Sequence, residues 1–199
     1  MSTNLAPRRL VGSIVRLDPL LRSHASALAG VGLHPELWAL QPKVIATPAD
    51  MQAYVDLALD EQARGVSLPF AIVHQAAGSV IGSTRFMDIA LRHRRLEIGA
   101  TWITPGFQRS GANVEAKLLL LTYAFETLGI QRVVLKTEAL NAQSRNAILA
   151  LGAVEEGTFR KHLIAENGRV RDMVYFSILS AEWPAARARL EARLRKRHG

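Results

Sequence analysis

The order of hydrophobic and polar residues along this chain of 199 residues predicts alternating sheet and helix segments. Alternating or β-branched apolar runs bounded by turn residues predict strands. The predicted strands occupy residues 10–20, 69–75, 80–89, 94–104, 131–138, 153–164 and 170–180. Apolar residues three and four positions apart predict helices. They occupy residues 24–32, 47–65, 113–129 and 141–152, and a basic helix begins at Pro184. Residues 34–42 are predicted to be a loop that carries Trp38.

Two of these helices have distinct sequence signals. In residues 113–129 one face carries five apolar side chains at spacings of four and three, and Gly129 ends the helix: Val114, Leu118, Leu121, Phe125 and Leu128. In residues 47–65 Thr47 is the expected N-cap, Pro48 lies in the first turn and Gly65 ends the helix.

The order of elements predicts an α/β or α+β domain with a mixed sheet. The short turn at residues 76–79 favours an antiparallel meander, and the Asn-Gly pair in "ENGR" predicts a hairpin between the last two strands. No G-x-G-x-x-G follows the first strand and no Walker sequence is present. A doubly wound nucleotide-binding fold is therefore excluded.

Composition narrows the class of protein further. The apolar fraction of 49% is enough for a packed core. The absence of cysteine excludes disulfides, thiolate nucleophiles and cysteine metal sites, and it is typical of a cytoplasmic protein. No signal-peptide segment is seen at the N-terminus, and no apolar run approaches the roughly 18 residues of a membrane span. The six histidines are scattered without H-E-x-x-H spacing, so no metal site is expected.

The formal charge of +8 is concentrated at the C-terminus. The last thirteen residues hold six basic residues and one glutamate, a net +5, and the rest of the chain carries only +3. We therefore divide the chain into a single domain, residues 1–183, and a basic helical tail, residues 184–199. The tail is either a contact for RNA or an acidic partner, or a solvated helix that aids solubility. Nucleic acid is not the expected partner.

The stretch "QRSGAN", between a strand and a helix, has the features of an anion site. The first N–H groups of a helix lack intrahelical partners, and the helix dipole adds a partial positive charge. Gly111 allows close approach to a ligand oxygen, and Arg109 supplies a cation. A purely structural interpretation is also open, in which Gly111 is a turn residue, Asn113 an N-cap and Arg109 a surface charge.

Over residues 10–183 the sequence resembles the GNAT acetyltransferase superfamily, and within it the Rim-type ribosomal-protein N-terminal acetyltransferases. The resemblance rests on "EIGATWITPGFQRSGANVEAK", on the N-x-x-S at Asn141 and Ser144, and on "ALGAVEEGTFRKH". It implies a mixed, mostly antiparallel sheet of seven strands, flanked by helices and splayed between strands 4 and 5.

The resemblance also implies acetyl-CoA as co-substrate and no metal. The family pattern Gln/Arg-x-x-Gly-x-Gly/Ala falls on Gln108, Gly111 and Asn113, and Asn113 is larger than the residue expected. The pyrophosphate is expected on this loop, and the pantetheine arm along the preceding strand and at Asn141. The implied cofactor-binding residues are Trp102, Ile103, Thr104, Gln108, Arg109, Ser110, Gly111, Ala112, Asn113, Asn141 and Ser144.

Glu97 is the candidate general base for deprotonating an amine. Strict alternation along its strand places Glu97 on one face with Gly99 and Thr101, which leaves room for substrate or water. The opposite face would then carry Leu96, Ile98, Ala100 and Trp102. In many members of the family a glutamate on this strand takes the amine proton, often through water. The alternative is a surface or salt-bridged glutamate, with Arg94 or Arg95 nearby.

Three further residues are candidates for the site. In Rim-type relatives a serine at the position of Ser144 lies near the thioester sulfur and is a candidate proton donor. The alternative is a plain helix start, in which Asn141 is the cap and Ser144 the third helical residue. Trp38 and His162 are candidates for the acceptor side, and Trp38 is equally compatible with the core.

The function predicted from sequence is that of an acyltransferase. It moves an acetyl group from acetyl-CoA directly to a primary amine, either a protein N-terminus or a small molecule. Two alternatives stay open: a non-catalytic acyl-CoA sensor, because of Asn113, and a ribosome- or RNA-associated protein that uses the basic tail. Exposed strand edges and the last helix also allow a homodimer.

Overall fold

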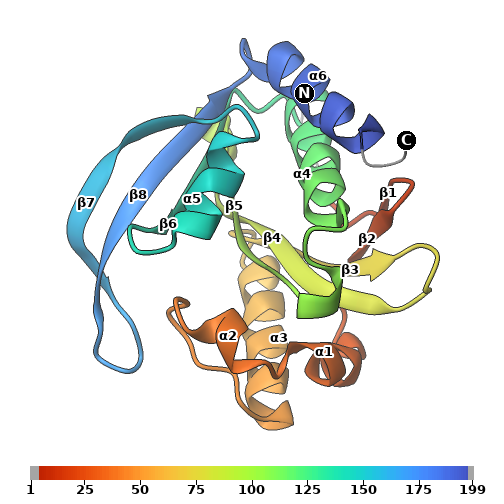
Figure 1. Cartoon of the computed structure of the whole chain (residues 1–199), viewed down its shortest axis with the longest axis vertical. Coiled ribbons are helices and arrows are strands. Elements are labelled where there is room, and N and C mark those ends of the chain that lie inside the picture. The colour runs from red at the N-terminus through yellow and green to blue at the C-terminus, as the bar shows by residue number, and fades with distance from the viewer. Residues whose placement is uncertain (1–4, 197–199) are drawn as a thin grey trace.

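The computed structural model describes residues 5–196 and shows one mixed sheet between two groups of helices (Figure 1). The strand order is β1-β2-β3-β4-β5-β6-β8-β7, and every neighbouring pair is antiparallel except the parallel pair β5 and β6. The strands are β1 (Leu10–Val11), β2 (Val15–Pro19), β3 (Leu68–His74), β4 (Val80–Ala90), β5 (Arg95–Ile103), β6 (Arg132–Glu138), β7 (Val154–Ile164) and β8 (Val170–Leu179).

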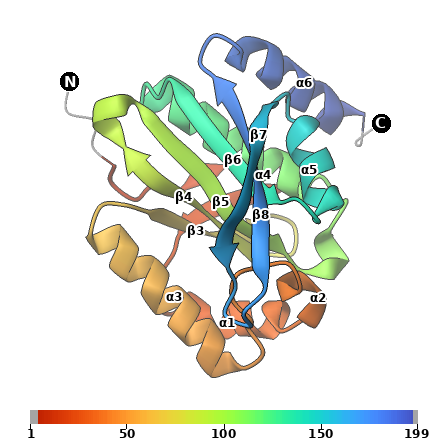
Figure 2. The same cartoon turned by 90° about the vertical axis from the view of Figure 1, so that its left-hand side faces the viewer.

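The helices divide between the two faces of the sheet, each over its own apolar cluster. The larger cluster lies under α4, α5 and α6, and the smaller one under α1, α2 and α3. The helices are α1 (His24–Gly32), α2 (Pro35–Trp38), α3 (Pro48–Ala63), α4 (Ala112–Thr122), α5 (Ala142–Leu149) and α6 (Trp183–Arg195). Figure 2 shows the β7–β8 hairpin running from α6 toward α1 and α2.

The predicted fold class is confirmed, with one more strand than expected. The run at residues 10–20 is broken after Val11 into β1 and β2, so the splay lies between β5 and β6 in this numbering. The break is held by Glu115 of α4, whose carboxylate accepts hydrogen bonds from the N–H groups of Ser13, Ile14 and Val15. A Cβ at Gly12 would lie 2.4 Å from the Glu115 carboxyl carbon, so a larger residue here would displace the carboxylate that holds this turn.

The predicted helix ends are partly confirmed. Thr47 caps α3 in a capping box with Asp50, and Asn141 caps α5 by accepting a hydrogen bond from the N–H of Ser144. The prediction of a loop at residues 34–42 was incomplete, because α2 forms there with Pro35 in its first turn. After Thr122 the helix α4 continues as a π-turn, Tyr123–Thr127.

A bulge in β5 makes the predicted alternation wrong beyond Gly99. Trp102 of β5 pairs with Ser83 and Gly99 with Arg85, so three steps along β5 match two along β4. The extra residue is Ala100, which has a left-handed backbone with φ of 47°. Trp102 consequently lies in the cluster under α1–α3, whereas Leu96 and Ile98 lie in the one under α4.

The C-terminal helix is anchored to the body of the protein. Trp183, Ala186 and Leu190 of α6 are buried in the larger cluster. Arg187 donates to Glu126 and to Glu191, so part of the basic charge is already paired. Arg197 and His198 lie outside the described residues, and the boundary at residue 183 stays a prediction. None of the helices within residues 5–196 is both long and apolar enough to cross a membrane.

Candidate active site

The site is built at a fork between the two parallel strands. β5 and β6 pair only from Arg95 with Arg132 to Glu97 with Val134, and then they diverge. Beyond Glu97, β5 keeps β4 on one side and faces the fork with its other edge. Because strand backbone groups seek hydrogen-bond partners, this edge can take an extended ligand in the manner of an added strand.

The loop that follows β5 forms the start of α4 at the open end of the fork. Arg109 and Gly111 both have left-handed backbones, with φ of 61° and 96°. Gly111 is the N-cap of α4, and as a glycine it has no side chain to cap the helix. The alternative in which Asn113 is the N-cap was wrong, because Asn113 lies inside the first turn. Its buried Oδ1 has no hydrogen-bond partner among the described residues.

Other side chains of the loop stabilise its own shape. Gln108 Nε2 donates to the carbonyl of Ile103 at 3.1 Å. Ser110 Oγ donates to the carbonyl of Phe107 at 2.7 Å and accepts from the N–H of Ala112 at 3.3 Å. The predicted anion loop is therefore held in place by its polar side chains, while the uncapped helix start leaves backbone N–H groups for a ligand.

Glu97 occupies the last paired position at the base of the fork. Its residue is only 3% exposed, and Lys136 Nζ of β6 lies 2.7 Å from its Oε2. Glu97 is salt-bridged, as the alternative interpretation expected, but it is buried and its partner is Lys136 of the neighbouring strand and not Arg94 or Arg95. Burial raises the pKa of the Glu97 carboxyl, and the Lys136 ammonium opposes that rise. A buried carboxyl with a raised pKa is a general-base candidate.

Replacing Lys136 with Met is expected to move the acid limb of the pH–rate profile to higher pH. Lys136 favours the charged form of Glu97, so its loss raises the pKa of Glu97 further and leaves more of the base protonated at pH 6. The pH dependence of kcat/KM tests this, with Lys43→Met, a lysine paired with Glu166, as the matched control. An unchanged acid limb would contradict the assignment of Glu97.

His162 belongs to an aromatic group on the same face as Lys136. Its Nε2 lies 2.9 Å from the hydroxyl of Tyr175, and the rings of Tyr175 and Phe159 are 4.7 Å apart. Lys136 Nζ lies 5.8 Å from the centre of the Tyr175 ring, which places the group beside the Glu97 ion pair. His162 and Phe159 are exposed, so they are available to an acceptor.

Trp38 is buried in the apolar cluster under α1–α3 and is not exposed at the site. It is 5% exposed, packs against Trp102 and Tyr54, and donates from Nε1 to the carbonyl of Gly32 at 2.7 Å. Its contact with an acceptor stays a prediction. Ser144 is half-buried in the first turn of α5, which follows the C-terminal end of β6, the second arm of the fork.

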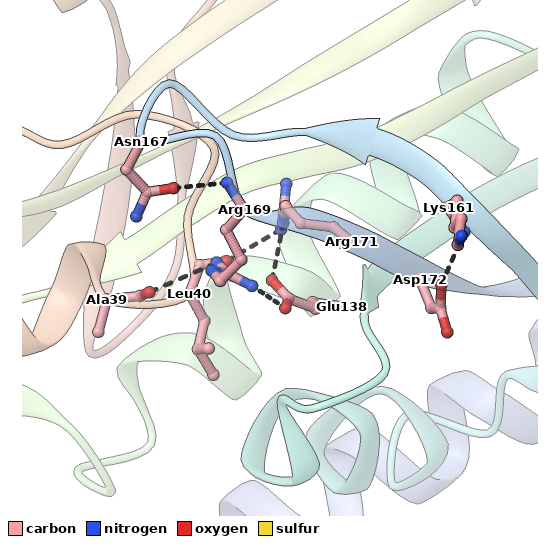
Figure 3. A network of polar contacts seen from close by, with 8 residues as sticks. All are labelled: Ala39, Leu40, Glu138, Lys161, Asn167, Arg169, Arg171 and Asp172. Atoms are coloured by element: carbon pink, nitrogen blue, oxygen red, sulfur yellow. Dashed lines mark hydrogen bonds and ion pairs between the residues drawn. The ribbon is translucent and has the colours of Figure 1, made fainter.

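Sequence reasoning missed a polar network that joins the hairpin tip to the loop after α2 (Figure 3). The buried Glu138 ends β6 and accepts from Arg171 Nε at 2.7 Å, and it also pairs with Arg169. Arg171 Nη2 donates to the carbonyl of Leu40 at 2.9 Å, and Arg169 Nη2 donates to that of Ala39 at 3.5 Å. The network fixes the β7–β8 hairpin beside the fork.

Sequence comparison places this arrangement in a known family. A family model described as "Acetyltransferase (GNAT) domain" matches residues 15–154. The chain belongs to the GNAT family. This confirms the predicted family and the acyltransferase class of the domain. Within residues 5–196 no three His, Cys, Asp or Glu side chains are placed to share a metal ion.

Individual relatives agree with the GNAT assignment. The protein named "Putative ribosomal N-acetyltransferase YdaF" from Bacillus subtilis is 37% identical over 106 residues, which span 53% of this chain and 57% of that protein. A crystal structure of a "putative acetyltransferase" from T. thermophilus is 37% identical, with a TM-score of 0.86 over 95% of this chain and 98% of that one. A GCN5-related N-acetyltransferase from Brucella melitensis is 31% identical, with a TM-score of 0.86 over 94% and 85%. The name of YdaF agrees with the resemblance to the ribosomal-protein type.

Proposed function

We propose that this GNAT domain transfers an acetyl group from acetyl-CoA directly to a primary amine. The observation that carries the proposal is the fork between β5 and β6, which opens toward the uncapped, glycine-led start of α4 and has the buried Glu97 at its base. An extended thioester with a pyrophosphate group matches a free strand edge that leads to a helix N-terminus.

The residues present fit acetyl-CoA. The N–H groups at the start of α4, with Arg109 and Gly111, would hold the pyrophosphate. The edge of β5 at Trp102 and Ile103, Thr104 just beyond it, and the start of α5 at Asn141 would hold the pantetheine arm. Asn113 is half-buried in the first turn of α4, and its buried Oδ1 is an acceptor that a phosphate oxygen cannot satisfy, so the fit rests on the backbone N–H groups and Arg109. When bound, acetyl-CoA supplies an activated acetyl group.

Glu97 takes a proton from the acceptor amine as the new C–N bond forms and the C–S bond breaks. The proton that the departing thiolate needs comes from Ser144 or from solvent. No covalent enzyme intermediate is required, because the chain contains no cysteine and Glu97 serves as base for direct attack. An α-amine, with a pKa near 8, is neutral enough at pH 7 to need only one modest base.

The acceptor is expected to approach on the face that carries Glu97, Lys136 and the group of Phe159, His162 and Tyr175. Release of the free thiol of CoA from acetyl-CoA tests the function, with peptides that have free N-termini and small primary amines as acceptors. The proposal predicts thiol release that needs an unblocked amine. A peptide with an acetylated N-terminus and no lysine is the matched control. No release above hydrolysis across the panel would contradict the proposal.

A further inference from the structure

A buried lysine on α4 touches the bulged part of β5. Lys117 is 6% exposed, and its Nζ donates to Thr101 Oγ1 at 2.6 Å. Thr101 Oγ1 also lies 2.7 Å from Thr84 Oγ1 of β4. None of the ion pairs found within residues 5–196 includes Lys117. This amine therefore sits in the interior with a hydroxyl as its partner, and not with a carboxylate.

The contact is made at a strained point of the strand. Thr101 follows Ala100, whose φ of 47° is a left-handed conformation that alanine rarely adopts. From the other face of the sheet the Tyr54 hydroxyl donates to the carbonyl of Ala100 at 3.4 Å. The bulge is thus held from both faces, by Tyr54 of α3 and by Lys117 of α4.

The bulge sets the position of the strand edge that faces the fork. It shifts the register of β5 just before Trp102 and Ile103, whose backbone leads to the loop at the start of α4. A change in the bulge would move this edge relative to Glu97, which lies before it. Displacement of reacting groups by about 1 Å can lower a rate by about a hundredfold.

We propose that Lys117 is a positioning residue for acetyl transfer, which holds the β5 bulge in place through Thr101. This inference rests on the proposed function. An uncharged amine suits the role, because a cation there would favour the charged form of Glu97 and weaken it as a base. Burial lowers the pKa of Lys117 to about 7, and the charge of Glu97 opposes that fall. The other charged groups around Glu97 are Lys136 and Asp88.

The first test is the variant Lys117→Met, which keeps the aliphatic bulk and removes the hydrogen bond. We expect kcat to fall by about 10- to 100-fold, with the dissociation constant of acetyl-CoA changed less than about threefold. We expect the melting temperature to rise at pH 7, because the variant removes an amine whose charged form is destabilised by burial. A residue that served only to stabilise the fold would show a lower melting temperature instead.

The pH dependence of stability gives a second readout that needs no activity. The folded-state pKa of Lys117 is lowered below its ordinary value of 10.5, so protonation of Lys117 destabilises the folded state relative to the unfolded state. Wild-type stability should rise as pH increases from about 7 toward 10. The advantage of Lys117→Met should therefore be largest at pH 6 and should shrink by pH 9.5.

A double-mutant cycle with Thr101 tests whether Lys117 affects kcat through its hydrogen bond to Thr101. Thr101→Val should lower kcat as Lys117→Met does, the double variant should be no slower than either, and Thr101→Ser should stay near the wild-type rate. Leu118→Met, one position along α4, is the control. A kcat of Lys117→Met equal to that of the wild-type protein would overturn this inference and leave the proposed function standing. Losses in kcat that add independently in the double-mutant cycle would do the same. A wild-type protein that neither binds acetyl-CoA nor releases thiol would overturn the proposed function as well.

Discussion

A Glu97→Gln variant is expected to turn over about 10²- to 10⁴-fold more slowly than the wild-type protein, with unchanged affinity for acetyl-CoA. Glutamine keeps the size and the hydrogen-bonding shape of the side chain but cannot accept the amine proton. The acetyl-CoA contacts proposed above come from the start of α4 and the edge of β5, so binding should persist. Steady-state kinetics together with calorimetric titration of acetyl-CoA separate the two effects.

The pH–rate profile of the wild-type protein tests the same role of Glu97. Burial raises the pKa of Glu97, so the acid limb of the wild-type profile should lie above the ordinary glutamate value of 4.5. The base is active when deprotonated, so the rate increases with pH through this limb. Asp88→Asn is the matched control, because Asp88 faces the same lysine but is 62% exposed. Equal losses in Glu97→Gln and Asp88→Asn would contradict a specific role for Glu97.

A Glu138→Gln variant is expected to lower the free energy of unfolding by about 3–5 kcal/mol and the melting temperature on the order of 10 °C. Glu138 is 2% exposed and is the carboxylate partner of both Arg169 and Arg171. Without it, Arg171, only 4% exposed, would be left as a buried and uncompensated cation. The two arginines that reach from the hairpin to the loop after α2 would lose the carboxylate that orients them (Figure 3).

Urea unfolding of this variant should be compared with that of Glu155→Gln. Glu155 pairs with Arg145 on the surface, where both side chains are 37% exposed. An exposed pair of this kind contributes about 0–1 kcal/mol, so the control should unfold close to the wild-type protein. If both variants lost the same small amount, the Glu138 network would not be a structural anchor.

Local signals predict the parts of the site that depend on one segment of chain. The glycine and polar residues of "QRSGAN" before an apolar run predict that a helix begins at the end of this stretch. In the structure Gly111 is the N-cap of that helix. Asn141 is recognisable as an N-cap because its side chain bonds a residue only three positions away. The order and length of the apolar runs are enough for the antiparallel part from β1 to β5, where neighbouring strands follow one another along the chain, whereas β8 lies between β6 and β7.

The parts that depend on contacts distant in sequence are not predictable in the same way. Strict alternation fails at Ala100 because the bulge is stabilised by Tyr54 and Lys117, which lie on two other elements. The ion pair of Glu97 with Lys136 depends on how far β5 and β6 run together before they diverge. A lysine within the apolar strand "RVVLKTE" is the one local signal that points to it.

Calorimetric titration is the decisive test of our proposal that acetyl-CoA binds along the edge of β5 with its pyrophosphate at the start of α4. Acetyl-CoA and CoA should bind to the wild-type protein, and ATP should not. Gly111→Val should weaken binding by at least about tenfold, because a β-branched residue does not adopt the φ of 96° at this N-cap. Binding of ATP as tight as that of CoA, or no binding of acetyl-CoA, would show that this fork is not an acetyl-CoA site.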